Sequence, residues 1–165
     1  MMIRIAGIVQ ESVVDGPGFR LAVFTQGCPH HCPGCHNPET HSFTGGTLVD
    51  TETIVALMNN PLLDGITLTG GDPFCQPESC TMLAKAAHDR GLNVWAYTGW
   101  TLDEILNLID SARWLLGEVD VLVDGPYLES QRTLEAPFRG SRNQRLIDVK
   151  RTLSEKQIIE WRVDK

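Results

Sequence analysis

Residues 21–35 read LAVFTQGCPHHCPGC. Residues 21–25 are apolar or β-branched, and such a run predicts a short buried strand. The strand leads into a loop that contains three cysteines, Cys28, Cys32 and Cys35. Proline and glycine within that loop bend the backbone, so the three sulfur atoms can converge. The sequence therefore predicts a thiol-rich loop at the end of a buried strand.

Strand and helix patterns alternate downstream of this loop. Alternation of this kind predicts a parallel sheet with crossover helices. A complete eight-unit barrel needs roughly 250 residues, so we expect an α/β fold built as a partial, open β/α barrel. It would contain about five to six parallel strands with flanking helices, in a single domain over residues 1–165. The expected strands are 65–69, 93–97, 119–123 and 146–149, and the expected helices are 50–60, 77–90, one from about 102 and a short one capped by Ser154.

Several short polar turns follow the ends of these strands. Gly70-Gly71-Asp72, Thr98-Gly99 and Asp124-Gly125 each come directly after an expected strand, as the cysteine loop does. Ligands of open α/β sheets bind beyond the carboxyl ends of the parallel strands. We therefore expect the four loops to gather on one face.

Composition narrows the class of protein. Hydrophobic residues make up 42% and charged residues 21%, which is typical of a water-soluble domain. The net charge of −7 argues against a nucleic-acid partner. We see no run of about 20 apolar residues and no signal peptide, so we expect no membrane association and a cytoplasmic location. Three of the five cysteines fall within eight residues, and in a reducing cytosol such a cluster indicates metal or redox chemistry rather than disulfides.

The spacing Cys-x3-Cys-x2-Cys leaves more than one metal possible. Three thiolates can hold three irons of a four-iron cluster and leave the fourth iron open to a small molecule. A zinc site is the alternative, and it would need a fourth ligand such as Cys75, Cys80 or His31. Otherwise Cys75 is expected to be a small buried or pocket-lining thiol, and Cys80 a packing residue within a helix. A simple electron carrier would use four cysteines, and the local motif supplies three.

The cysteine spacing, followed by a Gly-Gly-acid turn, resembles the radical S-adenosylmethionine superfamily. Residues 14–20 (VDGPGFR) and 24–28 (FTQGC) resemble its glycyl-radical activating enzymes. Residues 35–40 (CHNPET) and 139–145 (RGSRNQR) are similar to the activating proteins of anaerobic (class III) ribonucleoside-triphosphate reductase. The matching blocks run from about residue 12 to 148. The resemblance implies that the open barrel is of the radical S-adenosylmethionine type.

The resemblance also implies the chemistry. Cys28, Cys32 and Cys35 would bind a [4Fe–4S] cluster, and S-adenosylmethionine would chelate its open iron. Reductive cleavage would give a 5′-deoxyadenosyl radical, which takes a hydrogen atom from a glycine of the reductase. No catalytic residue beyond the cluster and cofactor ligands is implied, and an electron donor such as flavodoxin would be a second partner. Two alternatives stay open: an activator of another glycyl-radical enzyme such as pyruvate formate-lyase, and a zinc-stabilised binding module.

Cofactor contacts follow from the same resemblance. The turn of Gly70, Gly71 and Asp72 would bind the amino group of the methionine moiety, through either the Asp72 side chain or the backbone. His36 would stack on the adenine, because the place before Cys35 that often holds an aromatic residue is Gly34 here. The segment 139–145 has three arginines and would recognise a carboxylate of the cofactor or of the reductase. The implied cofactor-binding set is Gly34, Cys35, His36, Gly70, Gly71 and Asp72.

Overall fold

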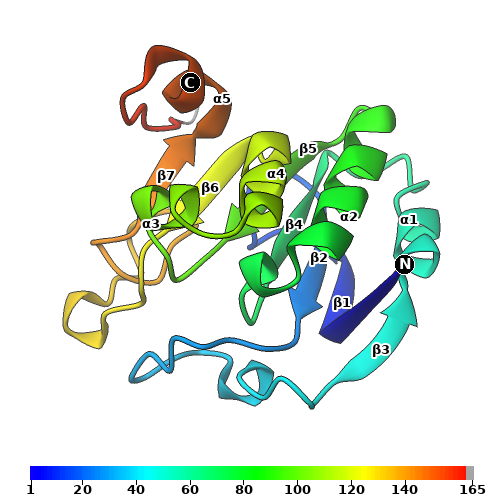
Figure 1. The fold of residues 1–165 in the computed structure, drawn as a ribbon, viewed down its shortest axis with the longest axis horizontal. Coiled ribbons are helices and arrows are strands. Elements are labelled where there is room, and N and C mark those ends of the chain that lie inside the picture. The colour runs from blue at the N-terminus through cyan, green and yellow to red at the C-terminus, as the bar shows by residue number, and fades with distance from the viewer. Residues whose placement is uncertain (163–165) are drawn as a thin grey trace.

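The computed structural model describes residues 1–162 and places a seven-stranded sheet at the centre of the fold (Figure 1). The strands are β1 (Met2–Ser12), β2 (Arg20–Thr25), β3 (Thr47–Asp50), β4 (Gly65–Gly70), β5 (Asn93–Tyr97), β6 (Val121–Asp124) and β7 (Arg145–Asp148). The α-helices are α1 (Thr51–Leu57), α2 (Pro77–Asp89), α3 (Leu102–Leu106), α4 (Asp110–Glu118) and α5 (Val149–Glu155). The sheet order is β3-β1-β2-β4-β5-β6-β7.

The α/β class is confirmed, and the expected number of parallel strands is corrected. Among the strands that the structure describes, only β2, β4, β5 and β6 run parallel, so the count is four rather than five to six. β1 pairs antiparallel with both β2 and β3, and β7 pairs antiparallel with β6. The loop between β1 and β2 spans only residues 13–19, too short for a parallel crossover, and no α-helix separates β6 from β7.

Three local expectations also differ from the structure. β1 and β3 were not expected, because neither strand has a continuous apolar pattern. The helix expected from 102 is two short helices, although the capping box of Thr101 and Glu104 is present. The last helix begins earlier than expected, because the Asp148 side chain accepts a hydrogen bond from the backbone N–H of Arg151 and caps it there.

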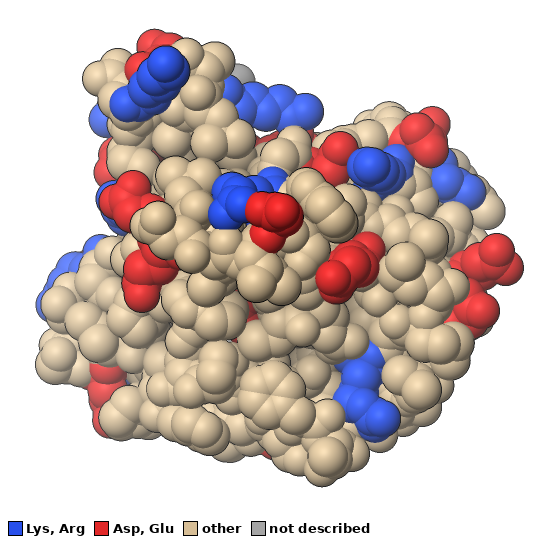
Figure 2. Space-filling view, viewed as in Figure 1, with Lys and Arg blue, Asp and Glu red and all other residues tan. Residues whose placement is uncertain are grey.

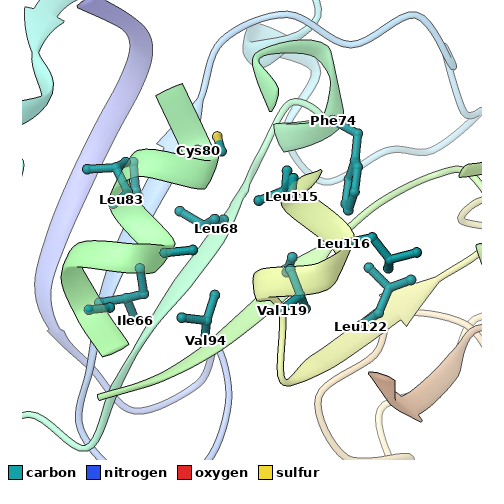
Figure 3. Packing of buried hydrophobic residues seen from close by; sticks show 14 of the residues in the cluster. Ile66, Leu68, Phe74, Cys80, Leu83, Val94, Leu115, Leu116, Val119 and Leu122 are labelled. Carbon is teal, nitrogen blue, oxygen red and sulfur yellow. The ribbon is translucent and has the colours of Figure 1, made fainter. Parts of the chain in front are cut away.

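One face of the sheet packs against the helices and holds the main core. Figure 3 shows side chains of β4, β5 and β6 directed toward α2 and α4. Each buried aliphatic side chain stabilises the fold by roughly 1.5–3 kcal/mol relative to an exposed one. Labelled members of this core include Ile66, Leu68, Val94 and Leu122 from the sheet and Cys80, Leu83, Leu115 and Leu116 from the helices.

The opposite face of the sheet is covered by loop residues. Trp95 of β5 packs edge-on against Phe138 and Trp161, with ring centroids 5.3 and 4.8 Å away. Arg20 is fully buried beneath this cluster, 5.6 Å from the Trp95 ring centroid. Burial lowers the pKa of Arg20 to about 10. These aromatic contacts hold the loop of Phe138 against the sheet, and Phe138 lines the cleft described below.

Arg20 also fixes the loop that joins β1 to β2. Its Nε donates to Thr67 Oγ1 at 2.8 Å, and Thr67 Oγ1 donates to the backbone oxygen of Asp15 at 2.7 Å. Its Nη1 donates to the backbone oxygen of Pro17 at 3.1 Å. The loop is thus tied to β4 through a buried guanidinium.

Within residues 1–162, every helix falls short of the length and apolar character that crossing a bilayer requires.

Candidate functional site

The four strand-end loops meet at one cavity of about 120 Å³. Cys28, Cys32 and Cys35 all line it. The turns that follow β4, β5 and β6 line it too, as expected for the carboxyl edge of parallel strands. Their contributions are Gly70, Gly71, Thr98, Gly99 and Gly125.

A second, larger cleft of about 640 Å³ continues from this cavity. The two share Cys35, Thr69, Tyr97, Tyr127 and Gln144 in their walls. The rest of the large cleft is formed by the β1–β2 loop, the end of the cysteine loop and the long loop between β6 and β7. Its other lining residues include Val14, Asp15, His36, Asn37, Leu134, Phe138 and Arg139. A small thiol-lined chamber therefore opens into a space large enough for a nucleoside-sized ligand.

Backbone and amide hydrogen bonds give the cysteine loop its shape. Gln26 donates from Nε2 to the backbone oxygens of Glu39 and Ser42, at 3.0 and 2.7 Å. The Cys28 backbone N–H donates to the His41 oxygen at 3.2 Å. The loop therefore closes on itself at residues 39–42, and the three cysteines lie on the enclosed arc.

The three thiols are free and half-exposed. As placed, no three His, Cys, Asp or Glu side chains among residues 1–162 are close enough to hold a single metal ion. Burial raises the pKa of the Cys28 thiol to about 11. The His30 backbone N–H opposes this rise in pKa, and the Asp72 carboxylate adds to the rise. A bound metal cation would reverse this balance, because it stabilises the thiolate.

The donor set fits an iron–sulfur cluster. Beside the three thiols, His41 lines the same cavity, and its Nε2 is buried without a hydrogen-bond partner. A buried polar atom is normally paired, and the sulfur atoms of a cluster are hydrogen-bond acceptors. Cys75, Cys80 and His31, the residues considered as a fourth zinc ligand, are not among the residues lining this cavity. Cys80 is fully buried within α2.

The glycines of the turn after β4 are required by packing. Gly70 has a φ of +94°, which favours glycine. A Cβ on Gly70 would collide with the backbone of Phe24 and Thr25, and a Cβ on Gly71 would collide with the backbone of Gly27. The turn therefore presses directly against β2 and the start of the cysteine loop, and its backbone forms one side of the cavity.

The Asp72 carboxylate is already fully engaged inside the protein. Its Oδ2 accepts hydrogen bonds from His30 Nε2 at 2.7 Å, Thr98 Oγ1 at 2.8 Å and the Gly99 N–H at 3.0 Å. Its Oδ1 accepts from the Phe74 N–H at 3.0 Å. The residue is 1% exposed and does not line either cavity. The Asp72 side chain therefore connects the cysteine loop to the turn after β5. The residues of its own turn that face the cavity are Gly70 and Gly71.

His36 and Gly34 are placed differently from each other. His36 lines the large cleft, and its ring lies 4.9 Å from that of Tyr127. Gly34 lines neither cavity. A Cβ there would meet the carboxyl carbon of Glu129 at 2.7 Å, so the absence of a side chain lets Glu129 approach.

The structure separates the three arginines of segment 139–145. Arg139 is the one Lys or Arg lining the large cleft among the described residues. Its Nη1 donates to the Gln144 backbone oxygen at 3.0 Å, while its buried Nε has no partner. Arg142 is exposed, and Arg145 pairs with Asp124. Only Arg139 is positioned to meet a ligand of the cleft.

Several lining residues were not singled out from the sequence. Thr69 could have been found, because it lies at the carboxyl end of an expected strand. Tyr127 and Gln144 belong to a long loop whose path the sequence does not specify. His41 carries no local signal, since its role depends on the backbone pairing with Cys28.

Comparisons with known proteins identify the family of the chain. The family described as "4Fe-4S single cluster domain" matches residues 14–147. Curated relatives named "Anaerobic ribonucleoside-triphosphate reductase-activating protein" are similar to this chain. The Haemophilus influenzae protein is 35% identical over 144 residues, covering 80% of this chain and 89% of that protein. The Vibrio cholerae protein is 36% identical, with the same coverage of each chain. The Enterobacteria phage T4 protein is 35% identical, covering 81% and 86%.

A more distant likeness exists among solved structures. QueE from Escherichia coli is 17% identical, with a TM-score of 0.47, covering 61% of this chain and 54% of that one. This likeness is too remote to bear on the site. The family match and the curated relatives each span most of the chain, so the chain belongs to the 4Fe-4S single cluster domain family and, within it, to the anaerobic ribonucleoside-triphosphate reductase-activating proteins.

Proposed function

We propose that this chain activates an anaerobic ribonucleoside-triphosphate reductase by generating its glycyl radical. The observation that carries the proposal is the continuity between the three-thiol cavity and the large cleft, in a chain whose relatives bear that name. Cys28, Cys32 and Cys35 would hold a [4Fe–4S] cluster. When bound, the cluster supplies the one-electron reductive cleavage of S-adenosylmethionine to the 5′-deoxyadenosyl radical that abstracts hydrogen from the reductase glycine.

The protein's own residues orient the cofactor. Gly70 and Gly71 face the cavity and offer backbone atoms to the methionine moiety, while Asp72 acts by holding the turn. His36, beside Tyr127, is the proposed contact for the adenine ring. Gly34, also expected at the cofactor, acts in this proposal by admitting Glu129 behind the cysteine loop.

Arg139 is the proposed partner of the cofactor's carboxylate. It lines the large cleft together with Cys35 and His36, and its buried Nε lacks a hydrogen-bond partner. A guanidinium binds a carboxylate through a rigid fork of donors, and such charge-assisted bonds are roughly twice as strong as neutral ones. The pairing would fix the end of the cofactor that lies farthest from the adenine.

The reductase would dock at the open rim of the large cleft. Two of its lining side chains are apolar and largely exposed, Val14 at 74% and Leu134 at 88%. Burial of such side chains at an interface is favourable, and exposed apolar residues around a cleft support a protein partner. Val14 belongs to the loop anchored by Arg20, so this side of the rim is held in place before docking.

The proposal extends to the electron donor, to the location of the protein in the cell and to its domain organisation. An electron donor such as flavodoxin would reduce the cluster, and neither nucleic acid nor a membrane would take part. Figure 2 supports the first exclusion for the helix-covered face, where acidic and basic side chains are interspersed. The protein would act in the cytoplasm as one domain over residues 1–165. Its open sheet would correspond to a partial barrel of the radical S-adenosylmethionine type.

Anaerobic reconstitution with iron and sulfide tests the proposal. The protein would be incubated with dithionite, S-adenosylmethionine and the anaerobic reductase, then examined by electron paramagnetic resonance for a glycyl radical. A radical on the reductase, with 5′-deoxyadenosine as product, is the expected result. A radical formed only on pyruvate formate-lyase would reassign the partner. Zinc in place of iron in anaerobically isolated protein would favour the binding-module alternative instead.

A further inference from the structure

One buried carboxylate joins three of the loops around the cysteine cavity. Asp72, after β4, accepts from His30 in the cysteine loop and from Thr98 and Gly99 after β5. All three bonds reach the same oxygen, Oδ2, at 2.7 to 3.0 Å. The partners lie 42 residues before and 26 and 27 residues after Asp72, so the contact fixes segments that the chain itself does not hold together.

His30 is tightly enclosed on the other side of this bond. Its side chain is 15% exposed, and its ring packs edge-on against Trp100 with centroids 4.4 Å apart. A Cβ on Gly99 would overlap the His30 ring, so the ring fills the space that a side chain would occupy there. An ionised Asp72 can only accept, so Nε2 of His30 carries the shared hydrogen. The ring is therefore held in one orientation.

The backbone of His30 lies within the cysteine cradle, the segment that carries Cys28, Cys32 and Cys35. The backbone N–H of His30 acts on the Cys28 thiol, whose pKa it lowers, and the residue lies midway between Cys28 and Cys32 in the sequence. Its side chain contacts Asp72, whose own backbone belongs to the turn that lines the cavity. A single residue thus connects a cluster ligand with the Gly70–Gly71 turn.

Resting on the proposed function, we propose that His30 is a positioning residue: its hydrogen bond to Asp72 sets the cysteine cradle at a fixed place relative to the Gly70–Gly71 turn. The methionine moiety of the cofactor would touch both parts, the open iron of the cluster and the backbone of the turn. A cofactor held at two points binds well only when both points keep their spacing. Loss of the bond would therefore loosen the cradle and weaken cofactor binding while the three cluster ligands remain.

Paired substitutions separate the hydrogen bond from the packing of the ring. His30→Phe keeps an aromatic ring against Trp100 and removes the donor to Asp72. His30→Gln keeps an N–H donor and removes the ring. Asp72→Asn weakens the same bond from the other side and serves as a second route if the Phe variant folds poorly. Thr98→Val removes a different donor to the same oxygen without touching the cysteine loop.

The first measurement uses the protein without its cluster. Anaerobic alkylation of Cys32 by iodoacetamide would be followed by mass spectrometry, together with amide hydrogen exchange at Gly99. We expect His30→Phe and Asp72→Asn to raise the Cys32 alkylation rate several-fold and His30→Gln to restore it. Thr98→Val should speed exchange at Gly99 and leave the Cys32 alkylation rate unchanged.

The second measurement uses reconstituted protein. Iron and sulfide per chain should match the unsubstituted protein in all variants, while the Kd for S-adenosylmethionine should rise about tenfold in His30→Phe and recover in His30→Gln. Unchanged Cys32 alkylation and an unchanged Kd in His30→Phe would overturn the inference, as would a Gln variant that behaves like the Phe variant. If unsubstituted protein fails to bind S-adenosylmethionine, the proposed function fails, and the cluster-free alkylation rates still decide whether the bond holds the cradle.

Discussion

Asp124 and Arg145 form a two-point ion pair at the base of the long loop that walls the cleft. Arg145 Nη2 lies 2.6 Å from Asp124 Oδ2, and Nε lies 3.0 Å from Oδ1. Asp124 is 1% exposed, and its Oδ2 also accepts from the Leu102 N–H at 2.8 Å. This hydrogen-bonded pairing raises the pKa of Arg145. The pair therefore clamps β6 to β7 and to the start of α3, and it fixes both ends of the loop carrying Arg139.

Arg145→Met should lower the free energy of unfolding by about 1–3 kcal/mol, because it leaves a buried carboxylate without its charged partner. Urea unfolding of the cluster-free protein, followed by far-ultraviolet circular dichroism at neutral pH, measures this. Arg151→Met is the matched control. Arg151 pairs with Glu155 on the exposed surface of α5, where such a pair contributes about 0.3–0.5 kcal/mol. Equal losses in the two variants would contradict the clamp.

Cys32→Ala should abolish stable cluster assembly and 5′-deoxyadenosine formation, because two thiolates cannot complete the cradle. Iron and sulfide analysis after anaerobic reconstitution, with chromatography of the nucleoside product, measures both. Cys80→Ala is the control, since Cys80 packs within the helix-side core away from the cavity. A Cys32→Ala protein that retains full iron and activity would rule out the ligand assignment.

Arg139→Gln should raise the Kd for S-adenosylmethionine roughly 10- to 100-fold, the range for losing hydrogen bonds to a charged group. Isothermal titration of the reconstituted protein under nitrogen provides the value. Arg142→Gln should leave this Kd unchanged, because Arg142 is exposed and lines neither cavity. An equal rise in both variants would instead implicate the shape of the whole loop.

Leu134→Asp should reduce glycyl-radical formation on the reductase at least tenfold. The substitution places a charge where a docked protein would exclude water. Cleavage of S-adenosylmethionine driven by dithionite without reductase should be unaffected, so the ratio of the two rates isolates docking. Leu62→Asp alters an apolar side chain that is 58% exposed and lines neither cavity, and it should change neither rate. Unimpaired activation by Leu134→Asp would remove this residue from the interface.

The features predictable from the sequence are those encoded locally. The run at 21–25 is buried on both faces, and β4, β5 and β6 are buried too, so each appears as an apolar segment. The cysteine loop and the glycine turns follow these segments directly. Because the carboxyl ends of parallel strands meet at one edge of the sheet, the sequence already predicts that these loops lie together. β1 and β3 were not predicted, because both mix exposed and buried residues without a continuous apolar run, and strand formation there depends on pairing with distant residues.

The features that the sequence could not give depend on distant partners. Asp72 had two possible roles, and its bonds to His30 and Thr98 show that its carboxylate is already committed within the fold. Arg139, Arg142 and Arg145 are equivalent in the printed sequence, and only the path of a long loop separates their surroundings. The same is true of His41, whose buried Nε2 is recognisable only next to the cysteine cavity.

The described α-helices pack on one side of the sheet, and loops alone lie over the other (Figure 1). A reactive carbon radical formed at a site covered only by loops would be quenched by small molecules that diffuse in. Shielding would then come from the docked reductase, acting as the missing half of the reaction chamber. On this basis, the free protein should cleave its cofactor slowly and wastefully, and tight coupling of one cleavage to one activated glycine should emerge only within the two-protein assembly.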